Sequence, residues 1–442
     1  MAGWGLPQKL RLLDSVEGGD AVRELFQRTD DLILAAERSL EVADPAAAIR
    51  CVRALARAAG VISLSRWCAL FDRAVAASAP GHSARAELLV EALVPLSVSG
   101  RRGELRTLLL DALEHHGELG LRSRLLRALA STWREHDPER AAKRAEEAVA
   151  AAREAGDGGA EGRALLVLAR LRRAHGGTDE AAELLQRSAD LARAAGDNVV
   201  QHVLRELAEH HLERGRPRRA LALLEQSREV AEKLHRDPSG LALLLGRATA
   251  ALGLTAAARG HLEHAVARSS TSARPLEEAA ARLALGEAER RWGRPAVGHV
   301  HLLRAEKLQA SLDDPVGWAL VACRLGRAAL DLGDPAAAAR RLNDAHRRLD
   351  GVDAPRVHAE VAALDAELAA VSEEPLRARD CFRRAAAGFE ASGARVALAA
   401  LLERWAEFEA SEKQEAAAAS LFERLDEALL STVADEAAPF LL

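Results

Sequence analysis

The chain has 442 residues, of which 49% are hydrophobic and only 3% aromatic, and it contains no tyrosine. Runs rich in Val, Ile, Thr and aromatic residues are almost absent, which excludes a β-sandwich, a barrel or a doubly wound sheet and favours an all-α protein. The 61 basic residues are balanced by 66 acidic ones, giving a formal net charge of -5. The chain therefore has no general positive field that would bind nucleic acid.

Residues 1–83 are predicted to form an N-terminal helical cap that includes one degenerate repeat. Apolar residues recur at helical spacing over 32–40 and 46–59, and Asp44-Pro45 supplies an N-cap followed by a first-turn proline. The first residues lack the charged stretch and apolar core of a signal peptide, and no apolar run is long enough to cross a bilayer. We therefore expect a cytoplasmic protein without a membrane segment.

From residue 84 to 430 we predict about eight pairs of helices, followed by a C-terminal tail over 431–442. A turn glycine recurs at intervals of 39, 38, 40 and 40 residues. A small, a large apolar and a second small residue follow at fixed distances within the next helix, as in Ala258, Leu262 and Ala265 after Gly253. The five turn glycines are Gly176, Gly215, Gly253, Gly293 and Gly333. Such regularity indicates one structural unit repeated along the chain.

A small residue also lies seven positions before each turn glycine, and at three of these positions it is Gly246, Gly286 or Gly326. A glycine inside a helix costs about 1 kcal/mol of stability relative to alanine. Its recurrence at the same position of successive repeats therefore needs an explanation. We expect these residues to let the second helix of a pair pack closely against the first. The Ser269–Ser272 run is the most loop-like segment and is predicted to be a surface turn.

Taken together, these residues resemble the tetratricopeptide repeat. The family pattern is a Leu-small pair, a turn glycine, and then small, large apolar and small residues, and here it is matched by Leu168, Ala169, Gly176, Ala181, Leu185 and Ser188. The resemblance implies a right-handed superhelix, or solenoid, of stacked antiparallel helix pairs. The period of 38–40 exceeds the 34 residues of the classical repeat. Long Ala-rich arrays of this kind are similar to those of bacterial LuxR-type and STAND-type regulators, although this chain has neither a phosphate-binding loop nor a C-terminal helix-turn-helix.

No catalytic or metal-binding motif is apparent. The sequence contains no Gly-x-Ser-x-Gly elbow and no His-Glu-x-x-His pair, and its four cysteines are too widely spaced for a zinc site or a disulfide framework. His261 and His264 share one helix face, but we interpret them as solvent-facing residues rather than zinc ligands. We therefore predict a protein without catalytic residues, metal or cofactor.

The resemblance implies that the first helix of every pair lines a concave groove. Arginines at these positions would suit an acidic or carboxylate-bearing peptide, because guanidinium binds carboxylate through two parallel hydrogen bonds. The alternative is that an arginine-rich helical chain presents arginine on every face. Carried over position by position, the candidate binding residues are Arg127, Arg134, Arg163, Arg170, Arg173, Arg205, Glu209, Arg247, Glu287, Arg290, Arg291 and Arg327.

Family members that hold a chaperone tail use asparagines in this groove. The chain has only Asn198 and Asn343, and neither falls at a groove position, so we do not expect that ligand. We predict a non-catalytic protein-interaction or regulatory scaffold that binds a protein or peptide partner, with no nucleic acid and no membrane involved. The alternative is a regulatory module that senses a small molecule or peptide effector, as the resemblance to transcriptional regulators implies.

Overall fold

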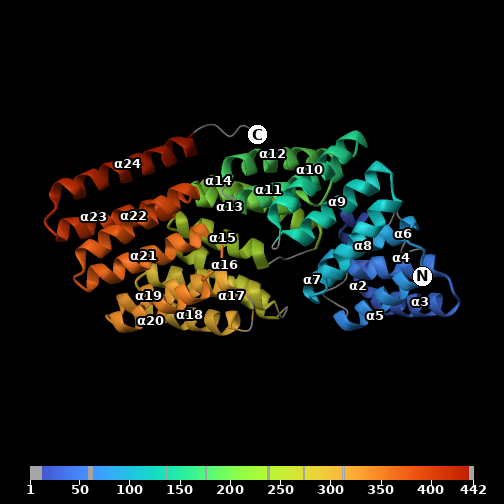
Figure 1. Ribbon diagram of the computed structural model, residues 1–442, viewed down its shortest axis with the longest axis horizontal. Helices are drawn as coiled ribbons and strands as arrows, with labels where there is room; N and C mark the ends of the chain where they lie inside the picture. The colour runs from blue at the N-terminus through green and yellow to red at the C-terminus, as the bar shows by residue number, and fades with distance from the viewer. Residues whose placement is uncertain are drawn as a thin grey trace. The chain divides into compact units, whose positions relative to one another are not determined.

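The computed structural model describes residues 12–57, 63–134, 137–174, 177–235, 239–271, 274–310, 312 and 314–437. Over these ranges the chain folds into helices, and the extended backbone forms no β-pairing beyond an isolated bridge between Ser15 and Asp197 (Figure 1). The predicted all-α class is confirmed.

The chain forms two compact units. Unit 1 comprises the described residues of Met1–Glu206 and Gln226–Asp237, and unit 2 comprises those of Leu207–Glu225 and Pro238–Leu442. The helices of unit 1 are α2 (Gly19–Gln27), α3 (Thr29–Glu41), α4 (Pro45–Arg57), α5 (Leu64–Ala76), α6 (Ser83–Glu91), α7 (Leu93–Val98), α8 (Arg102–His115), α9 (Leu119–Trp133), α10 (Pro138–Glu154), α11 (Gly158–Ala174) and α12 (Thr178–Ala194).

Two helices contribute residues to both units, namely α13 (Val200–Glu213) and α14 (Pro217–Lys233). The helices of unit 2 are α15 (Ser239–Ala251), α16 (Thr255–Thr271), α17 (Pro275–Arg291), α18 (Pro295–Gln309), α19 (Pro315–Asp331), α20 (Pro335–Arg348), α21 (Pro355–Val371), α22 (Pro375–Ala391), α23 (Arg395–Ser411) and α24 (Glu415–Ala437).

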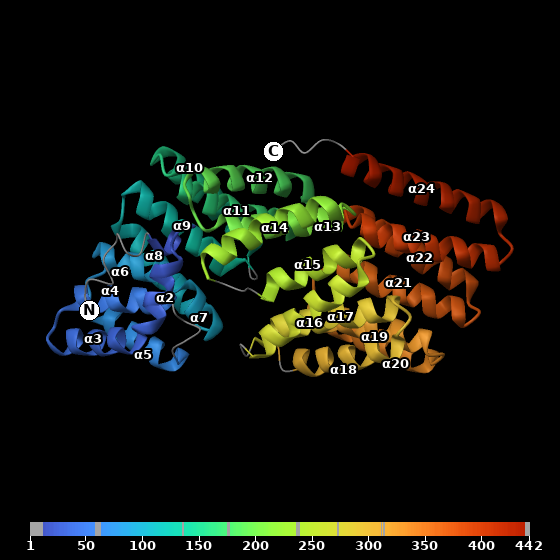
Figure 2. The same ribbon diagram turned by 180° about the vertical axis from the view of Figure 1, so that it is seen from behind.

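Consecutive helices pack in pairs, as the sequence period predicts. The closest helix contacts include α9 with α10, α11 with α12, α15 with α16, α17 with α18, α19 with α20, α21 with α22 and α23 with α24, and these partners lie side by side in both ribbon views (Figures 1 and 2). The predicted stripe of the second helix is buried, with Ala258, Leu262 and Ala265 at most 1% exposed. The stacking of helix pairs is therefore confirmed.

The turns between helices follow the predicted chemistry. Gly253 and Gly333 have φ of 74° and 76°, a left-handed conformation that glycine adopts without steric cost. The carboxylate of Asp334 then accepts a hydrogen bond of 2.8 Å from the backbone N–H of Ala337 and so caps α20. Asp44 caps α4 in the same way. The predicted turn at Gly176 lies outside the described residues.

Helical glycines mark close approaches, though not always between the two helices of one pair. A Cβ on Gly246 would lie 2.6 Å from Leu262, and one on Gly286 would lie 2.8 Å from Leu302, in each case on the second helix of the same pair. At Gly326 the contact is instead with Leu364 of α21, the first helix of the next pair, at 2.6 Å. The expectation of close packing is confirmed, but at Gly326 the partner helix differs.

One predicted loop is helical. Residues 269–271, expected to belong to a surface turn, continue α16 to Thr271. The buried hydroxyl of Ser269 donates to the backbone carbonyl of Ala265 at 2.7 Å, one turn earlier. Such back-bonding gives the hydroxyl a hydrogen-bond partner within the helix. The prediction of a turn was wrong here because it rested on composition alone. Ser272 lies outside the described residues.

The N-terminal part of unit 1 departs from the regular pairs. The short helix α7 is inserted between α6 and α8, and the aromatic rings of Trp67 and Phe71 stack on α5 with centroids 5.2 Å apart. Both side chains are fully buried and belong to one apolar core that extends as far as α11. No described helix is both long and apolar enough to cross a bilayer.

Candidate functional site

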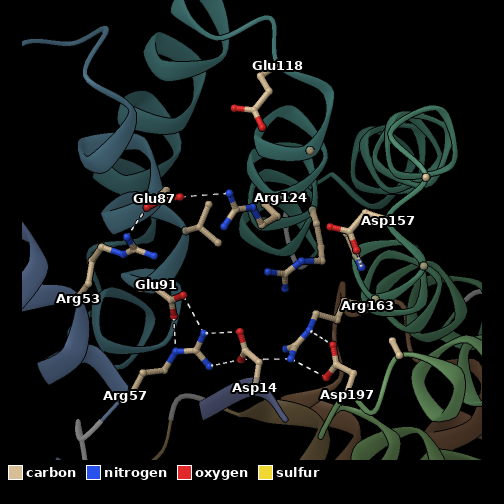
Figure 3. Close-up of a pocket in the computed structure, with 18 residues that line it drawn as sticks. Asp14, Arg53, Arg57, Glu87, Glu91, Glu118, Arg124, Asp157, Arg163 and Asp197 are labelled. Carbon is tan, nitrogen blue, oxygen red and sulfur yellow. Dashed lines mark hydrogen bonds and ion pairs between the residues drawn. The ribbon is translucent and has the colours of Figure 1, made fainter. Parts of the chain in front are cut away.

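Unit 1 contains a cavity of about 690 Å³ (Figure 3). Its lining comes from α4, α6, α9 and α11, from the loops that precede α11 and α13, and from the segment before α2. Of these, α9 and α11 are the first helices of regular pairs, which the sequence resemblance assigns to the groove, whereas α4 and α6 lie in the less regular N-terminal part of unit 1. We call this space the unit-1 cavity.

One wall is a pair of arginines facing a pair of glutamates. Arg53 and Arg57 lie one turn apart on α4, and they bind Glu87 and Glu91, which lie one turn apart on α6. Arg57 Nη2 lies 2.8 Å from Glu91 Oε1, and Glu87 also binds Arg124 of α9, with 3.3 Å between Oε1 and Nη2. Each carboxylate on this wall is therefore compensated by at least one guanidinium.

A second wall includes Asp14, which belongs to the short segment Leu13–Val16 before α2. Asn198 holds its backbone from two sides, because its side-chain amide donates to the carbonyl of Leu13 and its backbone N–H donates to that of Asp14, both at 2.7 Å. The N–H of Val16 in turn donates to Gly196 O at 2.9 Å. The segment is thus held against the loop before α13 by backbone hydrogen bonds.

The carboxylate of Asp14 points into the cavity between two arginines. Arg57 Nη1 lies 2.8 Å from Asp14 Oδ1, and Arg163 Nη2 lies 3.2 Å from the same oxygen. Arg163 also forms a two-pronged bond with Asp197, at 2.9 Å from Nε and 2.6 Å from Nη2. Burial alone would raise the pKa of Asp14, but Arg57 and Arg163 outweigh it and hold that pKa below its usual value.

The guanidinium of the remaining cavity arginine, Arg127 of α9, has no hydrogen-bond or ion-pair partner among the described residues, unlike that of Arg124 one turn earlier. Burial and the nearby positive charge of Arg163 lower the pKa of Arg127 to about 10. The guanidinium therefore remains protonated at neutral pH, and it is a cation without a direct counter-ion.

Two of the residues predicted for the groove, Arg127 and Arg163, meet in this cavity. The others in unit 1 lie elsewhere. Arg134 is exposed at the end of α9, and both Arg170 and Arg173 of α11 lie 2.8 Å from the carboxylate of Glu206 on α13. Arg205 contacts His202, one turn earlier on the same helix.

In unit 2 the side chains at the predicted positions form ion pairs. Most of these pairs join the first helices of neighbouring repeats. Arg247 lies 3.2 Å from Glu209, and Arg290 Nη1 lies 2.7 Å from Asp331. Arg327 is 3% exposed and binds Glu360 and Glu367 of α21 at 2.8 and 3.1 Å. Within α17, Glu287 accepts from both Arg290 and Arg291 at 2.9–3.1 Å.

Glu287 shows how strongly these pairs act on a buried carboxylate. Burial alone would raise its pKa, but the positive charges of Arg324, Arg290 and Arg291 lower it to about 2. At most of the predicted positions in unit 2, then, arginine and glutamate compensate one another within the protein. Their charges hold adjacent repeats together and are not directed as a row toward a ligand.

Several cavity residues were missed by reasoning from repeat positions, and three of them, Asp14, Arg53 and Arg57, precede the predicted array. A signal was nevertheless present: Arg53 and Arg57 precede Glu87 and Glu91 by 34 residues each, the spacing of neighbouring first helices. Asn198 was placed outside the groove, yet it binds the segment that forms a cavity wall. No sequence signal links Asn198 to Leu13, which lies 185 residues earlier. The other missed cavity residues are Glu118, Arg124 and Asp197.

The arrangement offers charge recognition without an evident nucleophile. Burial raises the pKa of Cys323 to about 12, so this thiol stays protonated. Across the described ranges, no three His, Cys, Asp or Glu side chains are grouped so that they could hold a metal ion.

No family model matches the sequence, and no curated protein matches it. Solved structures do resemble the fold. A Rap protein complexed with competence and sporulation factor has a TM-score of 0.65 at 13% identity, with 80% of this chain and 99% of that chain covered. NprR in complex with its cognate peptide NprX has a TM-score of 0.57 at 11% identity, with 78% and 98% covered.

A third structure, aspartyl phosphate phosphatase F from Bacillus subtilis, has a TM-score of 0.51 at 10% identity and covers 79% of this chain and 94% of its own. At these identities the likeness concerns the fold alone. Together with the helix pairs and their period, it shows that the chain has the tetratricopeptide-repeat fold.

Proposed function

We propose that this protein is a regulatory protein that binds a peptide segment in the unit-1 cavity. The observation that carries the proposal is the binding of the chain's own Leu13–Val16 segment on one wall. Its backbone is held by Asn198 and Gly196, and its acidic side chain is held by two arginines. A surface that already binds one chain segment through its backbone and its carboxylate has the chemistry to bind another.

The location and size of the cavity support the same function. A volume of about 690 Å³ is within the range of ligand pockets and accommodates several residues of a peptide. The lining helices α4, α6, α9 and α11 belong to successive repeats, so a ligand there would bridge repeats and bias their relative packing. Among proteins of similar fold, NprR binds a cognate peptide. The bound Leu13–Val16 segment favours a peptide over an effector of another kind.

A peptide selection with two matched variants tests the proposal. Random displayed peptides would be selected on the full-length protein, and the best binders would be measured by isothermal titration calorimetry. Gly120 lies second in α9 at the cavity wall, and a Cβ there would meet only Glu118 Oε1, at 3.7 Å. Gly120→Trp should therefore obstruct the cavity without disturbing the backbone.

The control is Gly103→Trp, at the second position of α8, where a Cβ would meet nothing within 4 Å and no cavity is lined. We expect Gly120→Trp to weaken binding of the selected peptides by about tenfold or more, and Gly103→Trp to leave it unchanged. Failure to select any peptide that binds above background would reject the proposal. Equal affinity of both variants would reject the cavity as the binding site.

A further inference from the structure

The unit-1 cavity contains five arginines, and four of them show what the cavity binds. Arg53 and Arg124 hold Glu87, Arg57 holds Glu91 and Asp14, and Arg163 holds Asp14 and Asp197. The partner is a carboxylate in every case. At Arg163 it is bound through Nε and Nη2 together, the planar fork geometry that distinguishes arginine from lysine.

The fifth arginine, Arg127, is the exception. It lies on α9 one turn after Arg124 and reaches the same cavity, but no carboxylate of the described residues binds it. The charges of Arg163 and Arg57 act against its protonated form, and those of Glu91 and Asp14 act for it from a distance. The cation is retained nonetheless at neutral pH. A partly buried charge without a direct partner costs free energy, which an anionic ligand group would recover.

We propose that Arg127 is a binding residue for a carboxylate of the ligand. This inference rests on the proposed function, in which a peptide enters the cavity, and it specifies the chemistry of the part that reaches α9. The carboxylate is a peptide's C-terminus or an acidic side chain, because both present the same two oxygens to the guanidinium fork.

The rest of the lining favours one carboxylate rather than a polyanion. Glu118 lies at the start of α9 and lines the same cavity, across the view from Asp14 in Figure 3, and it has no partner among the described residues. The cavity is lined by six acidic and five basic side chains, so a second negative group on the ligand would meet uncompensated repulsion. A ligand with a single acidic end, followed by neutral or basic groups toward Glu118, fits these charges.

The test uses two kinds of probe on the full-length protein. The first pair is butyrate, which has a single carboxylate, and its uncharged analogue butyramide, measured by thermal shift and calorimetry. The second pair is the selected peptide with a free C-terminus and the same peptide as a C-terminal amide, together with a version in which its acidic side chains are replaced by amides. Arg127→Met is the test variant. Arg383→Met, an exposed change on α22 in unit 2, is the control.

We expect the acid forms to bind the unchanged protein about 10- to 100-fold more tightly than the amide forms, which is the value of a charge-assisted hydrogen-bonded pair. This preference should disappear in Arg127→Met and persist in Arg383→Met. Whether the C-terminal amide or the side-chain amides remove the preference identifies which carboxylate Arg127 holds.

The outcomes separate this inference from the proposed function. If the selected peptides bind but acid and amide forms bind alike, or if Arg127→Met keeps the preference for acids, the role of Arg127 is wrong while peptide binding stands. If no peptide binds but butyrate binds through Arg127, the carboxylate site stands and the peptide function is wrong. If neither class of probe binds, both are overturned. An unchanged far-ultraviolet circular dichroism spectrum and an unfolding midpoint no lower than that of the unchanged protein would establish that Arg127→Met is folded.

Discussion

Two clusters of arginine on first helices behave differently, one in each unit. In unit 2, Arg324 and Arg327 of α19 bind Glu360 of α21, and Glu367 on the same helix binds Arg327 and Arg404 of α23. Every arginine in this cluster has a direct carboxylate partner. In the unit-1 cavity Arg127 has none. Arginine is therefore fully paired with carboxylates of the protein in the unit-2 cluster, whereas one of the five arginines of the unit-1 cavity has no carboxylate partner among the described residues.

The first prediction removes the carboxylate that the unit-2 arginines share, so that they lack a direct partner as Arg127 does. Glu360→Leu would leave Arg324 and Arg327 without their shared carboxylate in a site where Arg327 is 3% exposed. Removing one partner of a buried ion pair costs about 3–5 kcal/mol, so we expect a loss of that size in the free energy of unfolding, measured by urea titration.

Glu374→Gln is the matched control, because its carboxylate lies 2.7 Å from Arg377 with both side chains about half exposed. An exposed pair contributes less than about 1 kcal/mol. Equal effects of the two substitutions would mean that the buried cluster contributes no more to stability than a surface pair, and the contrast between the units would lose its basis.

The second prediction concerns acid. In the folded state the pKa of Glu287 is about 2, against an ordinary value of 4.5, because Arg324, Arg290 and Arg291 outweigh the effect of burial. A lowered folded-state pKa contributes stability that is complete above the unfolded value and is lost as the pH falls from about 4.5 to 2. We expect urea unfolding to lose on the order of 2–3 kcal/mol through this window. Glu287→Gln should flatten the loss, and an unchanged pH profile in that variant would contradict the assignment.

The third prediction concerns the stability of two cavity variants, one of which is expected to change it least. Arg127→Met removes a cation without a direct counter-ion, so we expect the free energy of unfolding to stay the same or to rise by up to about 1 kcal/mol. Arg163→Met removes the partner of Asp197 and Asp14, and it should lower that free energy by about 2–3 kcal/mol. If Arg127→Met destabilised the protein as much as Arg163→Met does, Arg127 would be a structural residue.

The repeat could be predicted from the sequence because its signals are local and periodic. Turn glycines such as Gly253 and the buried stripe around Leu262 recur at one spacing, and each follows from a backbone angle or a helix contact. The contact of Gly326 with the next repeat was not predicted, since residue size alone does not tell which neighbouring helix approaches.

The candidate site was only partly predictable, and the reason is physical. Whether the charge of an arginine is compensated depends on carboxylates from other repeats. These carboxylates do not lie at a fixed sequence distance from the arginine. Arg163 binds a residue 34 positions later, whereas Arg290 binds one 41 positions later. The segment around Asp14 meets the loop at Asn198 only because the chain curves within unit 1, and nothing periodic encodes that contact.

The central claim is that a peptide binds along the first helices of unit 1, and photo-crosslinking tests it most directly. A selected peptide carrying a benzophenone side chain would be irradiated with the full-length protein, and the attachment sites would be mapped by mass spectrometry. The account predicts attachment to residues of α6, α9 and α11 that line the cavity. Attachment confined to the second helices α16, α18, α20 and α22 would contradict it.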